Sequence, residues 1–163
     1  MVCDQIITDL ATSPVSGGNQ YDRLKSFCGR LEADFLGSPQ PDGTIHYLYG
    51  KDVIGYLIYT ADGYMAAEIM DPDRRQSDPD FPHEFAAAQT LPESDRARAY
   101  STYVSYCGTY TVESDRVIHH VKAGLIPSWT GSDEVRPFHF DQGRLIIGEG
   151  HYKLTWERAV PHG

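Results

Sequence analysis

Two adjacent histidines, His119 and His120, lie in a segment whose residues alternate in character. Successive side chains of a β-strand point to opposite faces, so one imidazole must face inward and the other outward. Val117 and Val121 share the face of His119, whereas Lys122 shares that of His120, and we therefore place His119 inside. A buried neutral imidazole can exchange a proton near neutral pH, which suits general acid–base catalysis. A hydrogen-bonded core histidine is the alternative interpretation.

Arg136 shares a predicted strand face with Phe138 and Phe140, a surface that otherwise indicates core. An unpaired guanidinium is costly there, so it must meet a carboxylate, a carbonyl or a ligand oxygen. We favour a ligand-facing role, in which Arg136 stabilises an oxyanion or an enolate. The alternative is an internal salt bridge, for which Glu68 and Glu149 are candidate partners.

Tyr106 and Tyr110 alternate with Gly108 on one face of another predicted strand. Their hydroxyls can position a polyoxygenated substrate or donate a proton, although such a stripe also fits a core in which backbone groups satisfy the hydroxyls. Trp129 lies in a loop, where its ring either covers one end of the fold or holds the loop in place by packing. The predicted catalytic residues are His119, Arg136 and Tyr106, and the predicted ligand-contacting residues are Tyr56, Glu68, Tyr110, Trp129, Phe138 and Trp156.

Other chemistries lack the residue patterns that they require. The seven histidines include no His-x-His pair, and the strand phase that turns Arg136 inward turns His139 outward, so we expect no metal site. There is no Gly-x-Ser-x-Gly elbow, Cys107 has no identifiable base, and no glycine loop suits a phosphate. We therefore expect no cofactor.

Short alternating segments that position these residues recur from residue 29 onward. They lie at 29–35, 44–49, 53–60, 64–70, 103–113, 117–123, 134–140, 144–148 and 152–157. About eight to nine short strands favour an all-β antiparallel barrel, because closure removes exposed strand edges. The segments between residues 44 and 70 should form a three-stranded meander. One helix is predicted in the body, over 92–103, because Pro92 suits a first turn and acidic residues precede arginines.

The flanking and connecting segments have a different character. Residues 1–25 are predicted to be an N-terminal extension with a short helix, on which Ile6, Ile7 and Leu10 share one face. Residues 26–163 form the predicted barrel domain. The acidic, proline-containing stretch 71–82 is predicted to be an exposed loop.

Composition restricts the class of protein. The chain has 163 residues and a net charge of −9, which fits one domain and opposes nucleic-acid binding. No apolar run approaches the roughly 18 residues that cross a bilayer, so no membrane association is expected. Three cysteines without Cys-x-x-Cys spacing and an N-terminus without a secretory leader favour a cytoplasmic location.

Several fragments carry a family resemblance through their order along the chain. They are the segment 53–65, Tyr106-Cys-Gly-Thr-Tyr110, Val117-Ile-His-His-Val121, Pro127-Ser-Trp129 and Val135-Arg136. Together they resemble the lipocalin-like domain family of small bacterial and fungal proteins, over residues 29–156. The resemblance implies a barrel with an internal pocket. One departure is Leu31, which stands in Gly29-Arg30-Leu31 where the family commonly has Trp.

These features favour a cofactor-independent isomerase or cyclase of secondary metabolism, acting on a polyketide- or terpenoid-like molecule inside the barrel. His119 would be the general acid or base, Arg136 would stabilise negative charge, and Tyr106 would donate a proton or orient the substrate. A non-catalytic carrier of a lipid or aromatic metabolite is the competing hypothesis, and haem binding through His119 is a third. The expected partner is one small hydrophobic oxygenated ligand, bound by a monomer or homodimer. A one-residue slip in strand phase would exchange His119 for His120.

Overall fold

The structure is a computed structural model that describes residues 20–25, 27–32, 37–50, 52–74, 85–150 and 152–159. The predicted helix around Ile6, Ile7 and Leu10 lies outside these residues, as do positions 75–82 of the predicted acidic loop. The boundary between extension and barrel at residue 25 therefore stays a prediction.

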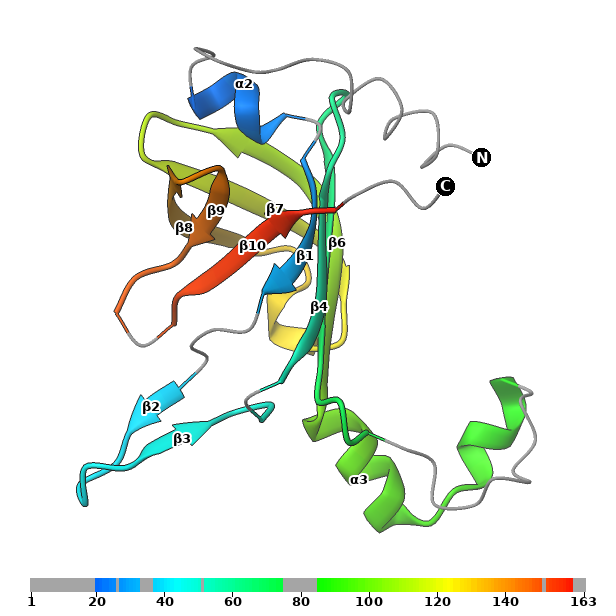
Figure 1. The fold of residues 1–163 in the computed structure, drawn as a ribbon. Helices are drawn as coiled ribbons and strands as arrows, with labels where there is room; N and C mark the ends of the chain where they lie inside the picture. Colours follow the sequence, from blue (N-terminus) through cyan, green and yellow to red (C-terminus); the bar gives the residue numbers. More distant parts are fainter. Residues whose placement is uncertain are drawn as a thin grey trace.

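Eight strands close into an antiparallel barrel (Figure 1). In chain order they are β1 (Cys28–Glu32), β4 (Ile54–Tyr59), β5 (Tyr64–Met70), β6 (Tyr103–Val112), β7 (Arg116–Gly124), β8 (Asp133–Asp141), β9 (Arg144–Ile147) and β10 (Leu154–Arg158). Around the barrel the order is β1-β10-β9-β8-β7-β6-β5-β4, and β4 pairs with β1 to close the ring. The predicted all-β antiparallel barrel is confirmed.

Two short turns show why neighbouring strands pair as hairpins. Gly63 ends the β4–β5 turn at φ 93°, and Gln142 and Gly143 form the β8–β9 turn at φ 47° and 85°. In the β8–β9 turn, positive φ at both central residues matches the right-handed twist of the flanking strands. In both turns, glycine adopts its positive φ without a Cβ clash.

The prediction of a three-stranded meander is wrong for its first segment, 44–49, which does not pair with β4. β2 (Gly37–Pro39) and β3 (Ile45–Tyr47) form a separate two-stranded sheet, seen in Figure 1 as an arm extending from the barrel. The physical reason is that β1 and β5 already occupy the two edges of β4, which leaves no edge for β3.

The helices lie at the periphery of the barrel. α3 (Glu93–Ser101) confirms the helix predicted over 92–103, and Figure 1 shows it beyond the ends of β5 and β6. The others are α2 (Gln20–Leu24) and the 3₁₀ helices η1 (Phe85–Thr90) and η2 (Pro127–Trp129). Within the described ranges, none of the helices is both long enough and apolar enough to span a membrane.

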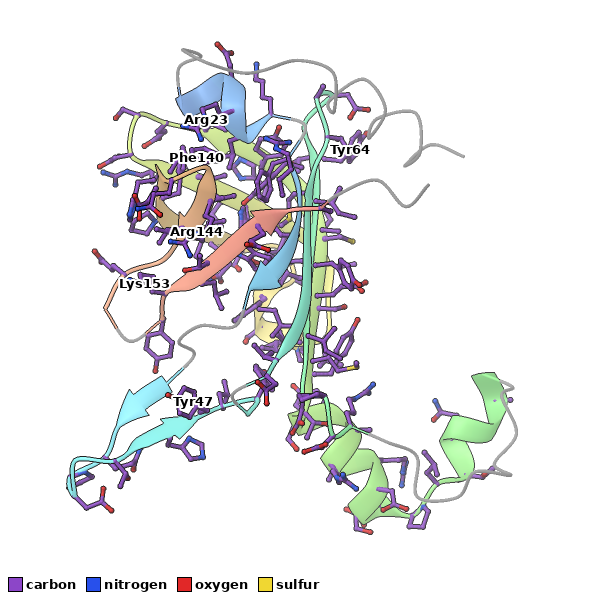
Figure 2. The ribbon with its side chains drawn as sticks, in the orientation of Figure 1. Arg23, Tyr47, Tyr64, Phe140, Arg144 and Lys153 are labelled. Carbon is purple, nitrogen blue, oxygen red and sulfur yellow. The ribbon has the colours of Figure 1, made fainter. Side chains whose placement is uncertain are left out.

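Side chains next to α2 fill one end of the barrel. Leu24 and Phe27 are fully buried in the core, and the Phe27 ring lies 6.3 Å from that of Phe140. The Arg23 guanidinium lies 4.1 Å from the centre of the Phe140 ring, and both are labelled in Figure 2. This packing closes the end of the barrel beside α2.

Gly108 lies at a point where the backbone of β7 comes close to β6. The register between these strands shifts at Cys107/Gly108, and a Cβ on Gly108 would lie 2.0 Å from the carbonyl oxygen of His120. Only glycine fits so near a neighbouring backbone. On either side of Gly108, Tyr106 and Tyr110 of β6 lie beside His119 of β7.

Candidate functional site

The barrel encloses a cavity of about 450 Å³. Most of its wall is apolar and comes from Leu57, Ala67, Ile69, Val104, Ile147, Leu154 and Trp156. Polar side chains gather on one side, where Tyr106, His119 and Arg136 border the same space. Exposed Leu48 and Tyr152 also line the cavity, which therefore opens to solvent near the β2–β3 arm and the β9–β10 connection. Such a cavity suits a small, mainly apolar molecule with a few polar atoms.

His119 faces the interior, as predicted, and is only 1% exposed. Its Nε2 lies 2.6 Å from the hydroxyl oxygen of Tyr59, and its Nδ1 lies 2.9 Å from that of Tyr106. Burial, with smaller contributions from Arg136 and His120, lowers the pKa of His119 to about 3. The imidazole is therefore neutral at physiological pH, with both nitrogens occupied.

Tyr106 lies near both His119 and Arg136. Its hydroxyl oxygen lies 2.9 Å from Nδ1 of His119, and the Arg136 guanidinium borders the same side of the cavity. Burial raises the pKa of Tyr106, while Arg136 opposes that rise. Burial also raises the pKa of Tyr59 well above its ordinary value, with smaller contributions from Tyr106 and Tyr110. Both hydroxyls therefore carry their hydrogens at neutral pH.

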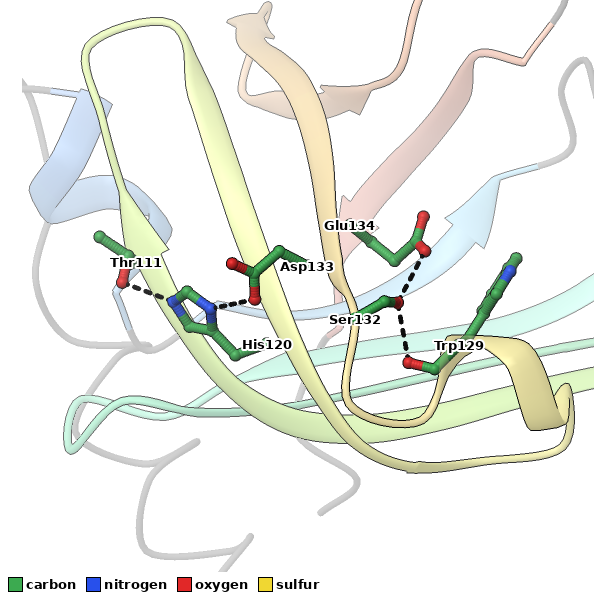
Figure 3. Close-up of polar contacts among 6 residues, drawn as sticks. All are labelled: Thr111, His120, Trp129, Ser132, Asp133 and Glu134. Carbon is green, nitrogen blue, oxygen red and sulfur yellow. Dashed lines mark hydrogen bonds and ion pairs between the residues drawn. The ribbon is translucent and has the colours of Figure 1, made fainter.

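Arg136 forms an internal ion pair, as in the alternative interpretation, but with a partner other than the candidates Glu68 and Glu149. Its Nη2 lies 3.0 Å from Oε2 of Glu134, and Glu134 stands two residues earlier on the same face of β8. The predicted partners Glu68 and Glu149 are wrong, because the alternation of β8 already places a carboxylate beside the guanidinium. The second Glu134 oxygen, Oε1, lies 3.1 Å from the Ser132 hydroxyl (Figure 3).

Trp129 lies on η2 beside the polar cluster and borders the cavity. Its ring meets that of Tyr106 edge-on at 5.3 Å, and the Arg136 guanidinium lies 5.9 Å from its centre. The Ser132 hydroxyl is 2.8 Å from the Trp129 carbonyl oxygen, which ties η2 to the start of β8. The Trp129 ring therefore covers Tyr106 and Arg136 at the cavity wall. Its backbone carbonyl also helps to hold the loop in place.

Four predicted ligand contacts do not border the cavity. Tyr56 is 48% exposed and stands opposite Glu68 in the β4–β5 register, so both lie on the outer face and their predicted place in the pocket is wrong. The reason is the phase of β4, which turns Leu57 and Tyr59 inward. Phe138 and Tyr110 do point inward but pack within the core, where the Tyr110 hydroxyl donates to the Thr60 carbonyl at 2.9 Å.

Sequence reasoning missed Tyr59 and Glu134. Glu134 carried a usable signal, because it alternates with Arg136 on a strand whose inward face was already assigned. Tyr59 carried a weaker one, since both faces of β4 are apolar: Ile54 and Ile58 are on one side and Leu57 is on the other. The phase of β4 became clear only from the burial of its side chains.

A second polar chain lies on the outer face of the barrel (Figure 3). The Thr111 hydroxyl lies 2.9 Å from Nε2 of His120, and His120 Nδ1 lies 2.6 Å from Oδ1 of Asp133. These residues come from β6, β7 and β8, and none of the three borders the cavity. Although a hydroxyl, an imidazole and a carboxylate also form hydrolytic triads, this chain lies on an exposed strand surface, where it links three strands.

Among the described residues that line it, the polar side of the cavity offers hydrogen-bonding groups but no free imidazole nitrogen. Because Tyr59 and Tyr106 occupy both nitrogens of His119, iron coordination by this residue would require one of these contacts to break. The hydroxyl of Tyr106 and the guanidinium of Arg136 are therefore the groups best placed to meet a ligand oxygen.

Comparison with known proteins agrees with this architecture. The sequence profile of the lipocalin-like domain family matches residues 36–159, which is well over half of the chain. A comparison with curated proteins finds no significant match. An eight-stranded barrel of this size can hold one small ligand in its interior. The chain belongs to the lipocalin-like domain family.

Proposed function

We propose that this protein is a cofactor-independent isomerase or cyclase that acts by acid–base catalysis on a polyketide- or terpenoid-like metabolite bound in the barrel. The observation that carries the proposal is the position of Tyr106, which borders an apolar cavity together with Arg136 and whose hydroxyl oxygen lies 2.9 Å from Nδ1 of His119. A phenol hydroxyl held beside a guanidinium in a water-poor space is suited to proton donation.

The charge of the site favours a neutral oxygen in the ligand. Glu134 compensates the charge of Arg136 through their 3.0 Å ion pair, so the cluster has little net charge to offer a carboxylate. A carbonyl or epoxide oxygen can instead accept the Tyr106 hydroxyl and develop negative charge beside Arg136. The surrounding apolar wall would hold the remaining carbon skeleton in a folded conformation.

A cyclisation on this site conserves atoms and protons. Tyr106 gives its proton to the carbonyl or epoxide oxygen while a hydroxyl of the same substrate attacks the activated carbon. The new C–O bond forms as the carbonyl π bond or the epoxide C–O bond breaks. The attacking hydroxyl then loses its proton to the Tyr106 phenolate, which restores the enzyme. Tyr106 thus acts first as an acid and then as a base.

His119 has a different role from the one expected from the sequence. Both of its nitrogens are hydrogen-bonded to tyrosines, and its pKa of about 3 leaves it neutral. We therefore assign the proton transfer to Tyr106 and the stabilisation of charge to Arg136. His119 acts on the reaction through Tyr106, as a positioning residue.

The same occupied imidazole favours a second candidate, a non-catalytic carrier. A carrier needs no free base, and the described lining of the cavity contains no histidine other than His119. Tyr106 and Arg136 would then fix the orientation of a ligand oxygen without changing the ligand.

A product assay separates the two candidates. The purified full chain would be incubated, without added cofactor, with a panel of hydroxy ketones, hydroxy enones and epoxy alcohols, and followed by liquid chromatography and mass spectrometry. An enzyme yields a product of unchanged mass and altered retention, and Tyr106→Phe lowers its rate at least about a hundredfold. Tyr110→Phe is the matched control, because Tyr110 lies outside the cavity lining. Stoichiometric binding with full recovery of unchanged ligand would favour the carrier.

A further inference from the structure

Tyr59, His119 and Tyr106 form a chain in which the hydrogens can be counted. The chain has two N···O contacts, and each contact requires one hydrogen. Neutral His119 supplies one hydrogen, from Nδ1 or from Nε2, so one of the two tyrosines must supply the other. The choice decides where the hydroxyl hydrogen of Tyr106 points.

In the first arrangement, Nε2 of His119 carries the hydrogen and donates it to Tyr59. Tyr106 then donates its own hydrogen to Nδ1. The hydrogen of Tyr59 is left without an acceptor, because Tyr59 is 1% exposed and His119 is the hydrogen-bond partner of its hydroxyl among the described residues. This arrangement leaves a buried donor unpaired.

In the second arrangement, Nδ1 of His119 carries the hydrogen and donates it to Tyr106. Tyr59 then donates to Nε2, and both contacts are satisfied. The hydrogen of Tyr106 is free to meet water or a ligand, since Tyr106 borders the cavity. The free-energy cost of an unpaired buried donor makes the second arrangement more populated than the first by roughly tenfold or more.

We infer that Tyr59 holds His119 as the Nδ1–H tautomer and thereby directs the hydroxyl hydrogen of Tyr106 into the cavity. Tyr59 is a positioning residue, since it acts through His119 and does not border the cavity. The Tyr106 oxygen then accepts a hydrogen bond from His119, and the positively charged Arg136 borders the same side of the cavity. The hydrogen bond and the nearby positive charge stabilise the phenolate that remains after a proton has passed to a ligand oxygen.

The inference extends the proposed function by specifying the kind of ligand atom that the site recognises. A hydrogen directed into the cavity requires an acceptor, such as a carbonyl or epoxide oxygen. The proton donor of the proposed function rests on this orientation. The tautomer itself is a property of the ligand-free protein, so it can be measured even if no reaction is found.

Nuclear magnetic resonance of the full chain, labelled with ¹⁵N-histidine, tests the inference directly. The chemical shifts of the two imidazole nitrogens distinguish a nitrogen that carries hydrogen from one that does not. The His119 signals are identified by their absence from the spectrum of His119→Gln. At pH 7 and without ligand, we expect at least about 90% of His119 in the Nδ1–H form. A predominant Nε2–H form would overturn the inference.

Tyr59→Phe tests whether Tyr59 is the cause. This variant removes the donor to Nε2 and keeps the ring, so a substantial Nε2–H fraction should appear. Tyr110→Phe is the matched control, because the Tyr110 ring packs against Tyr59 at 4.7 Å while its hydroxyl bonds Thr60. A folded Tyr59→Phe protein that remained wholly Nδ1–H would overturn the role of Tyr59. If this variant did not fold, the wild-type tautomer would still decide the orientation of Tyr106.

Discussion

Glu134 and Arg136 point into the same barrel interior, two residues apart on β8, and their side chains meet at 3.0 Å. The pair places a guanidinium beside Tyr106 without leaving an uncompensated positive charge in the barrel. Removing one partner of a partly buried pair costs more than the pair contributes, because the other charge is left unmatched. We therefore expect the pair to influence which ligand charge the cavity accepts.

Glu134→Gln should shift ligand preference from neutral to anionic molecules. The amide keeps the shape of the side chain and removes the charge that compensates Arg136. We expect the affinity for 2-naphthoate, relative to 2-acetylnaphthalene, to rise about tenfold, which corresponds to about 1.4 kcal/mol. Isothermal titration calorimetry with both probes measures the ratio. Glu68→Gln, which removes a charge from the outer face, should leave it unchanged. Preferential binding of naphthoate by the wild-type protein would contradict the argument.

Acid should destabilise the protein through His119. Its pKa is about 3 in the folded state, against an ordinary value of 6.5, so the unfolded state binds the extra proton between these values. The free energy of unfolding therefore falls as pH decreases from about 6.5 towards 3, by up to about 1.4 kcal/mol per pH unit.

Urea unfolding at several pH values, compared between the wild type and His119→Gln, isolates this contribution. The difference in unfolding free energy between the two proteins should shrink as pH falls through this window. His139→Gln, at an exposed position on β8, should follow the wild-type pH dependence. A parallel pH dependence of the wild type and His119→Gln would show that His119 is not buried in neutral form.

The two adjacent histidines should differ sharply in their effect on stability. His119→Ala opens a hole in the core and leaves the Tyr59 hydroxyl unpaired, at a cost of about 2–4 kcal/mol. His120→Ala removes contacts to Thr111 and Asp133 on the solvent face and should cost about 1 kcal/mol or less. Unfolding by urea at pH 7 compares the two variants. A larger loss of unfolding free energy for His120→Ala than for His119→Ala would mean that His120, and not His119, is the interior imidazole.

Gly108→Ala should be strongly destabilising although it adds only a methyl group. The new Cβ would lie 2.0 Å from the carbonyl oxygen of His120, and a β-strand backbone cannot move aside without breaking its ladder. We expect a loss of about 3 kcal/mol or more, measured by thermal or urea unfolding. Cys107→Ala, at the exposed neighbouring position, should change stability by less than about 0.5 kcal/mol. A mild effect of Gly108→Ala would mean that β6 and β7 can separate at this point.

The sequence alone determined the class of fold and the inward faces of its second half. Strict alternation on β7 and β8 identified His119 and Arg136 as interior residues, because a strand with one apolar face has only one favourable phase. The same reasoning placed Tyr106 on an inward face. The Asp62-Gly63 and Gln142-Gly143 turns were also predictable from the sequence, because glycine readily adopts the positive φ found at Gly63 and Gly143.

Only the tertiary structure decided which interior groups meet. Tyr59 comes from β4 and lies 60 positions before His119, so no local pattern could predict their contact. The phase of β4 was ambiguous because both of its faces are apolar, and this misplaced Tyr56. Glu68, the neighbour of Tyr56 on β5, lies on the same outer face. Likewise, barrel closure through β1 and β4 excluded β3 from the meander. Hydrogen bonds between distant strands depend on how the ring closes, which is a property of all eight strands together.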